Sequence, residues 1–333
     1  MIVMDKEDST MDYFLGFDVG SSKTHALIAD ENGQCLGFGK AQGGNHQSVG
    51  YDGLTDALRT SFGQARNMAG ATVDKIAGAG FGIAGFDFPT ERNFHLEAIA
   101  RLGLSCPVSL VNDGVNGLLA GSSHGIGVNI SAGSGINCCG RGPNGQEGRI
   151  VGNGTQFGEF GGGGEIVWKG LHKVNYAWIK RNPPTLITRI FLEAVGATNE
   201  LDLMEGLSNN RYNLSPAIAI QIFQAAREGD SAAREVLRFT GEEMGWLAVS
   251  VIRQIGMETD EVEVVLSGSV FAGGELILNP LQEVVLKQVP KARLIHLEFL
   301  PVLGPVILGM NASGLDGYSL RQNLIRTIKQ VIH

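Results

Sequence analysis

Two aspartates in this sequence follow apolar runs, and small polar residues come directly after the first of them, a pattern typical of phosphate binding. At the first, an apolar run ends at Asp18 and a turn follows, with the residues Gly20, Ser21, Ser22, Lys23 and Thr24. Glycine lets the backbone approach a ligand, and hydroxyl groups beside N–H groups can donate hydrogen bonds to phosphate oxygens. A neighbouring carboxylate can hold Mg²⁺ directly or through its waters. We therefore predict that the turn binds nucleotide phosphates and that Asp18 is linked to the metal.

The turn is not a Walker A loop, because the spacing G-x-x-x-x-G-K-[ST] is absent and a strand, not a helix, is predicted to follow. A tight β-hairpin with an aspartate at its entrance explains the same residues equally well. This stretch alone leaves both interpretations open.

The second carboxylate, Asp113, follows an apolar run over residues 107–111 and precedes a helix predicted over residues 115–120. It would lie at the carboxyl end of a strand, where open α/β sheets bind their ligands. An aspartate there can orient an attacking hydroxyl group and accept its proton during phosphoryl transfer. We predict that Asp113 is the general base. The alternative is that it caps the helix, and the two roles are compatible.

A related turn, with the residues Gly133, Ser134 and Gly135, lies between two further apolar runs. At an offset of 113 residues, Gly133 falls on Gly20 and Ser134 falls on Ser21. The recurrence of strand, turn and strand predicts two copies of one α/β unit. We predict that this second turn also contacts phosphate groups.

The elements that would position these residues follow from the spacing of apolar side chains. Strands are predicted over residues 14–18, 25–30, 35–40, 75–83, 107–111, 126–131, 136–139, 263–267 and 293–299. Helices are predicted over residues 54–68, 94–102, 115–120, 185–195, 215–228, 231–256, 276–287, 304–313 and 320–332. Alternating strands and helices indicate an α/β fold with a largely parallel sheet.

The net charge, the length of the apolar runs and the cysteine spacing limit which partners and which cellular compartment we expect. The 333 residues carry a net charge of −8, which argues against a nucleic-acid partner. No apolar run reaches the length of a membrane span, and residues 1–10 lack a signal-peptide core and are predicted to be a loose tail. The 4 cysteines show no metal-ligand spacing, as expected for reduced thiols, so we predict a cytoplasmic protein.

Four motifs in order resemble those of the actin-like ATPase superfamily, which includes sugar kinases and actin. They are Asp18-x-Gly-Ser-Ser-Lys-Thr24, Asn112-Asp113-Gly114, Ser131-x-Gly-Ser-Gly135 and Leu266-Ser-Gly-Ser-Val270. Over about residues 12–315 the chain most resembles the BadF/BadG/BcrA/BcrD ATPase family and its N-acetylglucosamine kinase-like members. The resemblance implies two actin-like (ribonuclease H-like) α/β domains, with ATP and Mg²⁺ in the cleft between them and a sugar on the N-terminal side.

The resemblance also implies roles for residues that spacing alone does not assign. Gly268 and Ser269 resemble the adenosine-side turn, although a simple strand-to-helix turn explains them too. Asn45 resembles a sugar ligand. Around Glu159, relatives carry a segment that resembles Gly-Asp-Glu-Gly-Ser, with acidic residues that reach the sugar. In this sequence Glu159 takes the place of the Asp and Phe160 the place of the Glu. We expect Glu159 to contact the substrate, with a reach that differs from that of the Asp in relatives.

The expected domains cover residues 12–121 and 122–310, and residues 311–333 form a C-terminal helix that packs back on the N-terminal domain. The predicted function is an ATP-dependent kinase that phosphorylates a hydroxyl group of an amino sugar, N-acetylglucosamine or a glucosamine-like hexose. The expected partners are a small sugar and a second copy of the chain in a homodimer, with no nucleic acid and no membrane. The alternatives are an ATPase that activates a reductase or dehydratase through an iron–sulfur cluster, and a sugar- or nucleotide-binding regulator without turnover.

Overall fold

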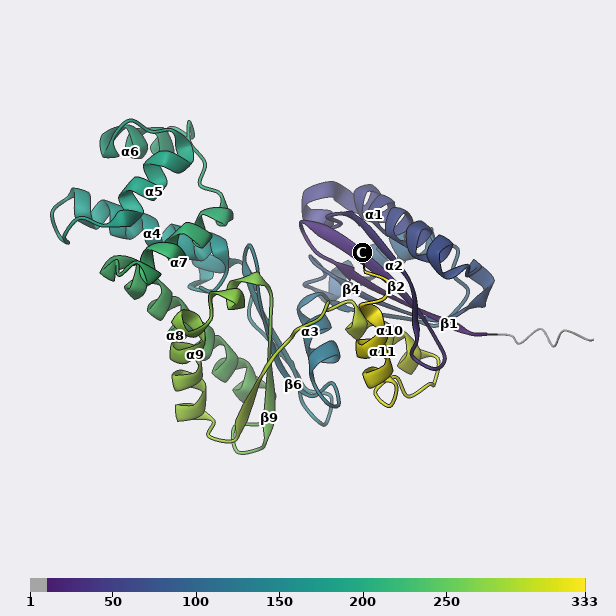
Figure 1. Cartoon of the computed structure of the whole chain (residues 1–333). Helices are drawn as coiled ribbons and strands as arrows, with labels where there is room; N and C mark the ends of the chain where they lie inside the picture. The colour runs from purple at the N-terminus through teal and green to yellow at the C-terminus, as the bar shows by residue number, and fades with distance from the viewer. Residues whose placement is uncertain (1–10, 333) are drawn as a thin grey trace, which may run out of the picture. The chain divides into compact units, whose positions relative to one another are not determined.

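The computed structural model describes residues 11–332, which form two compact units, each built on a five-stranded sheet (Figure 1). Unit 1 holds the described residues up to Gly125 together with those from Leu297 onward, and unit 2 holds Ile126–His296. The loose tail predicted for residues 1–10 lies outside the described residues.

The sheet of unit 1 has the strand order β3-β2-β1-β4-β5. Its strands are β1 (Tyr13–Val19), β2 (Lys23–Asp30), β3 (Cys35–Gln42), β4 (Ile76–Ile83) and β5 (Val108–Asn112). β1, β2 and β3 form an antiparallel meander, whereas β1, β4 and β5 run parallel. Val19 pairs with Ile83, and Ile83 pairs with Asn112, so the carboxyl ends of these three strands share one edge.

Neighbouring residues of the central strands point to opposite faces of this sheet, and each face has its own hydrophobic core. Leu15 and Phe17 pack against α1 (His46–Ala69) and α2 (Arg92–Ala100), with the short turns η1 (Val73–Lys75) and η2 (Pro89–Glu91) nearby. Phe14 and Leu27 pack against α10 (Leu303–Ala312) and α11 (Arg321–Ile328), beside α3 (Gly114–Gly121). Figure 1 shows α1 on one side of the strands and the two C-terminal helices on the other.

The place of α10 corrects the expected domain boundary at residue 310. A Cβ built on Gly16 would overlap Val306, and one built on Gly80 would overlap Pro305, so the helix backbone lies directly on β1 and β4. Only glycine permits such an approach. The helix therefore belongs to unit 1, and the second boundary lies at Leu297.

Unit 2 repeats the sheet of unit 1 in the order β10-β9-β6-β7-β8. Its strands are β6 (Gly127–Ala132), β7 (Ile136–Arg141), β8 (Glu147–Arg149), β9 (Val262–Ser267) and β10 (Ala292–His296). β6 pairs with β7 antiparallel and with β9 parallel, as β1 does with β2 and β4. The predicted duplication of the α/β unit is thus present as one topology used twice, and the predicted fold class is confirmed.

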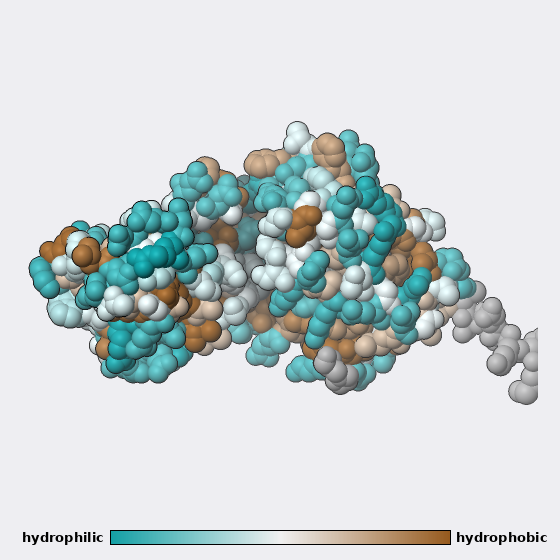
Figure 2. Space-filling model, turned by 90° about the horizontal axis from the view of Figure 1, so that it is seen from above, coloured by the Kyte–Doolittle hydropathy of each residue, from teal (hydrophilic) through white to brown (hydrophobic). Residues whose placement is uncertain are grey.

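One hydrophobic core joins the sheet of unit 2 to its helices. These helices are α4 (Gly163–Trp178), α5 (Leu186–Val195), α6 (Glu200–Ser208), α7 (Ala219–Arg227), α8 (Ser231–Gln254) and α9 (Glu275–Gln288), with short turns η3 (Gly154–Phe157), η4 (Pro216–Ile218) and η5 (Ser269–Gly273). On the face of the molecule drawn in Figure 2, hydrophobic residues are scattered among hydrophilic ones. Within residues 11–332, no helix is both long and apolar enough to cross a membrane.

Candidate functional site

Three aspartates lie around the shared strand edge of unit 1. Asp18 is near the end of β1, Asp87 follows β4, and Asp113 comes directly after β5. Because these strands are parallel neighbours, residues far apart in the sequence meet at one edge. The sequence analysis had predicted functions for Asp18 and Asp113, and the structure brings them into the same part of unit 1.

Asp113 has a pKa raised to about 7, chiefly because burial disfavours its charged form. The nearby charges of Asp18 and Asp87 raise the pKa further, and the backbone N–H groups of Gly114 and of Asp113 itself offset part of this rise. At pH 7 both the protonated and the ionised forms are therefore present, as a general base requires.

The capping alternative for Asp113 receives little support. Asp113 stands at the N-cap position of α3 but makes no side-chain capping hydrogen bond. Its neighbour Asn112 does this instead, because the Asn112 Oδ1 atom accepts from the Gly114 N–H at 2.9 Å. Asp113 also interacts with the first N–H of the helix, that of Gly114, but it makes no side-chain capping bond further into α3.

Asp18 is held by a residue that the sequence analysis did not find. The Asn116 Nδ2 atom donates to the Asp18 Oδ1 atom at 2.7 Å, and the His25 Nδ1 atom lies 3.9 Å from Oδ2. Burial raises the pKa of Asp18, and the hydrogen bond from Asn116 lowers it in part. His25 has its pKa lowered to about 4 by burial and stays neutral.

The surroundings of Asp18 suit a magnesium ion that keeps most of its ligands outside the protein. Asp18 retains 18% of its side-chain area exposed, and carboxylate oxygens are the ligands that Mg²⁺ prefers. Across the described part of the chain, no group of three or more His, Cys, Asp or Glu residues could hold a metal ion. Asp18 would therefore share the ion with waters and substrate phosphates.

The first predicted phosphate turn is a hairpin between β1 and β2, closed by a hydrogen bond from the Gly20 N–H to the Lys23 carbonyl at 2.9 Å. Ser21, Ser22 and Lys23 are exposed, as the prediction requires. Thr24 differs. Its side chain is fully buried within β2, so its hydroxyl group cannot reach a ligand, and we remove it from the predicted phosphate contacts.

Asn45, the predicted sugar ligand, is attached to this turn. Its Nδ2 atom donates to the Ser21 Oγ atom at 3.2 Å, while its Oδ1 atom accepts from the Gln47 N–H at 2.9 Å and caps α1. The Gly44 N–H also donates to the Gly20 carbonyl at 3.1 Å. The predicted phosphate and sugar contacts of unit 1 therefore form one connected loop system.

The second predicted turn occupies the same place in unit 2, between β6 and β7. Gly133 donates its N–H to the Gly135 carbonyl at 3.0 Å, and Ser134 and Gly135 are exposed. The first N–H groups of α4 brace the turn from behind, because Gly163 donates to the Gly133 carbonyl and Gly164 to the Ser134 carbonyl, both at 2.8 Å.

Beside this turn lies a cavity of about 640 Å³, a volume typical of small-molecule sites. Ser269 lines it, and Gly268 precedes it with a φ of 107° that favours glycine. The sequence analysis missed most of the wall, which combines apolar residues with one arginine. The lining residues are Gly133, Ser134, Gly163, Ser215, Pro216, Ala217, Ala219, Ile220, Phe223, Arg227, Ser269, Val270, Ala272 and Gly273.

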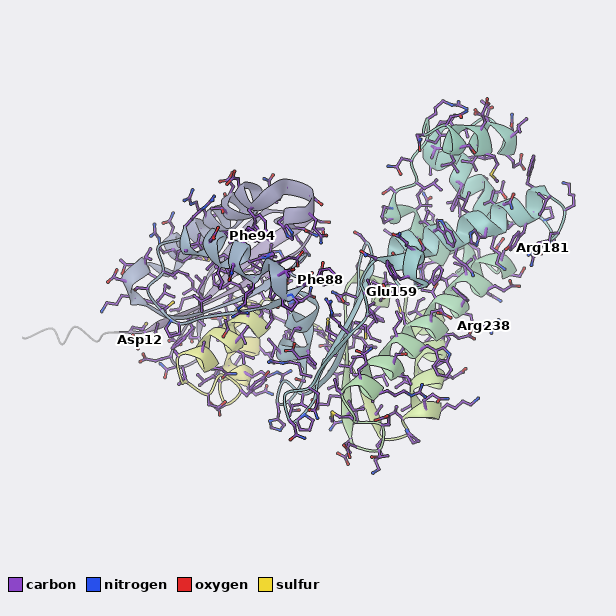
Figure 3. All side chains as sticks on the ribbon, turned by 180° about the vertical axis from the view of Figure 1, so that it is seen from behind. Asp12, Phe88, Phe94, Glu159, Arg181 and Arg238 are labelled. Carbon is purple, nitrogen blue, oxygen red and sulfur yellow. The ribbon has the colours of Figure 1, made fainter. Side chains whose placement is uncertain are left out.

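Glu159 does not fit its expected role as a sugar ligand. Its side chain is buried, and its carboxylate accepts three successive backbone N–H groups, from Val151 at 2.7 Å, Gly152 at 2.9 Å and Asn153 at 3.0 Å. Figure 3 shows it on the segment that leads into α4. We correct its role to a residue that organises the loop over residues 151–153, because three donors already satisfy its charge.

Comparison with known proteins identifies the family. Residues 15–309 match the BadF/BadG/BcrA/BcrD ATPase family. The chain belongs to this family. It is 24% identical over 312 residues to the N-acetyl-D-glucosamine kinase of Dictyostelium discoideum, covering 90% of this chain and 98% of that protein. It is 21% identical over 300 residues to the N-acetylmuramic acid/N-acetylglucosamine kinase of Clostridium acetobutylicum, covering 90% and 98%.

Solved structures agree on the fold of this family member. A protein of Chromobacterium violaceum, provisionally named an N-acetylglucosamine kinase, superposes with a TM-score of 0.69 at 22% identity, covering 90% of this chain and 99% of that one. A ROK family glucokinase of Streptomyces griseus, solved with glucose and AMPPNP, superposes with a TM-score of 0.51 at 17% identity, covering 92% and 97%. The two-unit α/β architecture is therefore that of sugar kinase structures.

Proposed function

We propose that this protein is an ATP-dependent carbohydrate kinase that transfers the γ-phosphoryl group to a hydroxyl group of an amino sugar, N-acetylglucosamine or a glucosamine-like hexose. Its family and the kinases among its curated relatives support the reaction class. The observation that carries the proposal is the place and protonation of Asp113. It follows the end of the edge strand β5, where burial, together with the charges of Asp18 and Asp87, raises its pKa to about 7.

In the proposed reaction Asp113 acts as general base. Its carboxylate accepts the proton of the sugar hydroxyl as the hydroxyl oxygen bonds to the γ-phosphorus. The bond between the γ-phosphorus and the β–γ bridging oxygen breaks, and ADP leaves with that oxygen. Because the leaving group is already a good one, positioning and charge stabilisation account for most of the acceleration.

The two turns are proposed to contact the phosphates, through Gly20, Ser21, Ser22 and Lys23 in unit 1 and Gly133, Ser134 and Gly135 in unit 2. The cavity beside Gly268 and Ser269 is proposed to receive the adenosine, since its volume and mostly apolar lining suit a purine nucleoside. Bound Mg²⁺ would neutralise phosphate charge, and Asp18 is the residue that would hold it.

Asn45 is the proposed sugar contact in unit 1. An amide side chain can donate to one sugar hydroxyl and accept from its neighbour. Its hydrogen bonds to Ser21 and Gln47 fix the orientation of the amide. Because Glu159 is buried in its own loop, the sugar would receive no carboxylate from that position.

The test is a panel of hexoses and hexosamines, each incubated with Mg-ATP while ADP formation is followed by a coupled assay. We expect ADP formation that depends on an amino sugar and is lost in the Asp113→Asn variant. Sugar-independent ATP hydrolysis, or full turnover by a folded Asp113→Asn protein, would contradict the proposal. Mass measurement in solution tests the predicted homodimer, which stays a prediction.

No observation favours the two alternative functions. An iron–sulfur activator needs accessible cysteine ligands, but Cys138 and Cys139 are both buried. A regulator without turnover has no need of a base poised near pH 7. Anaerobic purification with iron analysis, and equilibrium binding of sugar and ATP without product, would reveal either of these functions.

A further inference from the structure

Asp87 connects two parts of unit 1 that must lie correctly relative to each other for the proposed reaction. The Gln47 Nε2 atom donates to its Oδ2 atom at 3.1 Å, and the Asn112 Nδ2 atom donates to its Oδ1 atom at 3.0 Å. Gln47 belongs to the first turn of α1, just after Asn45, and Asn112 is the residue before Asp113. One carboxylate therefore joins the loop of the proposed sugar contact to the strand end that carries the proposed base.

Asn112 transmits this connection to Asp113. Besides its bond to Asp87, its Nδ2 atom donates to the Phe86 carbonyl at 3.2 Å, and its Oδ1 atom accepts from the Gly114 N–H. The Asn112 amide thus bonds the loop at residues 86–87 through its nitrogen and the start of α3 through its oxygen. A change at Asp87 would remove one of these hydrogen bonds and loosen the position of Asn112, the residue that precedes Asp113.

The backbone of Asp87 is also fixed by hydrogen bonds. Glu91 Oε2 accepts the N–H groups of Asp87 and Phe88, both at 2.8 Å, and His46 Nε2 lies 3.9 Å from Glu91 Oε1. Phe88, labelled in Figure 3, marks this loop at the start of η2. Because Glu91 closes the start of η2 in this way, the Asp87 side chain is presented from a fixed loop.

We propose that Asp87 is a positioning residue for phosphoryl transfer, which aligns the Asn45 loop with Asp113 by bridging Gln47 and Asn112. The inference rests on the proposed kinase function. Asp87 does not touch the reacting atoms in this account. It acts through Asn112 on the base and through Gln47 on the sugar loop.

The charge of Asp87 has a second consequence that separates positioning from a merely structural role. Asp87 and Asp18 both raise the pKa of Asp113, so removing one of these charges should move the titration of the base to lower pH. The other titratable groups near Asp87 are Glu91 in η2, His46 at the start of α1 and His95 on α2, and His95 senses the charge of Asp87 as well. A substitution at Asp87 leaves Glu91 and His46 in place, whereas His95 loses one of the charges that raise its pKa.

Two variants test the inference with ATP and the best sugar acceptor of the panel. Asp87→Asn removes the charge, and Asp87→Glu keeps the charge but lengthens the bridge. We expect both to lower kcat by about ten- to hundredfold, the loss expected for charge-assisted hydrogen bonds, with the KM for ATP within about twofold of wild type. Only Asp87→Asn should shift the acidic limb of the kcat/KM profile to lower pH. Asp52→Asn is the matched control, since it removes an exposed carboxylate elsewhere in unit 1.

The outcomes distinguish the inference from the function on which it rests. A wild-type protein that transfers phosphate to no sugar overturns the proposed function. An active wild type whose folded Asp87→Asn variant keeps its kcat and its pH profile overturns the inference alone. If neither Asp87 variant folds, the Gln47→Ala variant, which changes an exposed side chain, replaces them. A rise of about threefold or more in the KM for the sugar supports the bridge. An unchanged KM for the sugar overturns it.

Discussion

The raised pKa of Asp113 predicts that removing the proposed base stabilises the protein above neutral pH. The carboxyl group has a pKa of about 7 in the folded protein, against 3.8 for the free side chain. The folded state therefore binds the proton more tightly than the unfolded chain does. The free energy of unfolding falls as the pH rises from about 4 to about 7 and is level above that, because both states are then ionised.

The Asp113→Asn variant has no carboxyl group to ionise and escapes this loss. A shift of about three pKa units corresponds to about 4 kcal/mol as an upper limit. Asp113 is still partly exposed to solvent, and water therefore weakens the destabilisation caused by its charge. We expect a gain in the free energy of unfolding of about 2 kcal/mol. In a domain of this size that corresponds to a rise in Tm of about 4–8 °C at pH 8. At pH 4.5 the folded wild-type protein is still neutral at this position and only the unfolded chain ionises, so the Tm values should differ much less than at pH 8.

Scanning calorimetry at the two pH values is the appropriate assay. All 3 tryptophans, Trp168, Trp178 and Trp246, lie in unit 2, so tryptophan fluorescence follows unit 2 and serves as the internal control. A gain in Tm that is no larger at pH 8 than at pH 4.5 would refute the reasoning. The same substitution should lower kcat by about 10²–10⁴-fold, and wild-type kcat/KM should decline as the pH falls through about 7.

Three further substitutions test other parts of the structure. Gly268→Ala would place a Cβ against the Ala132 carbonyl at a φ of 107°, so we expect a lower Tm and a higher KM for ATP, whereas Gly63→Ala, in open space on α1, should fold normally. Glu159→Gln weakens three hydrogen bonds to a buried carboxylate, and urea unfolding followed by tryptophan fluorescence should show a loss of about 2–3 kcal/mol. Asn116→Ala removes the donor to Asp18, and we expect kcat to fall about tenfold or more in steady-state assays with a nearly unchanged Tm in unit 2.

Much of the fold followed from local pattern in the sequence. The runs that end near Asp18 and Asp113 are strands of one parallel set, and the small turns at Gly20 and Gly133 are equivalent hairpins. These features depend on neighbours in the chain, so apolar spacing and turn residues suffice to predict them. The carboxylates at strand ends could be found in this way because a strand end is itself a local feature.

Helix α4 shows where local pattern misleads. The four glycines over residues 161–164 favour a loop, yet α4 begins at Gly163. The Glu165 Oε2 atom accepts from the Gly162 N–H at 2.7 Å, and the next two N–H groups bind carbonyls of the turn at Gly133 and Ser134. Those partners come from a strand pair some thirty residues earlier in the chain, which a sequence window does not contain.

Burial explains why two predicted site residues, Thr24 and Glu159, do not fit their expected contacts. Thr24 is enclosed because β2 is covered on both faces, and every residue from Thr24 to Asp30 is buried. Glu159 turns inward because three N–H groups of residues 151–153 converge on it, and nothing in its own sequence surroundings shows that convergence. Asn116 was missed for the same reason, since its partner Asp18 lies 98 residues away.

Because α10 packs on the glycines of β1 and β4, unit 1 completes its folding only after the C-terminal part of the chain has been synthesised. Unit 2 is one continuous segment, Ile126–His296, and all of it leaves the ribosome before Leu303 does. Unit 1, although its strands are made first, keeps one face of its sheet uncovered throughout that time. The earliest-translated half is thus the last to be completed, and its exposed strands are the part of the newborn polypeptide most in need of protection by chaperones.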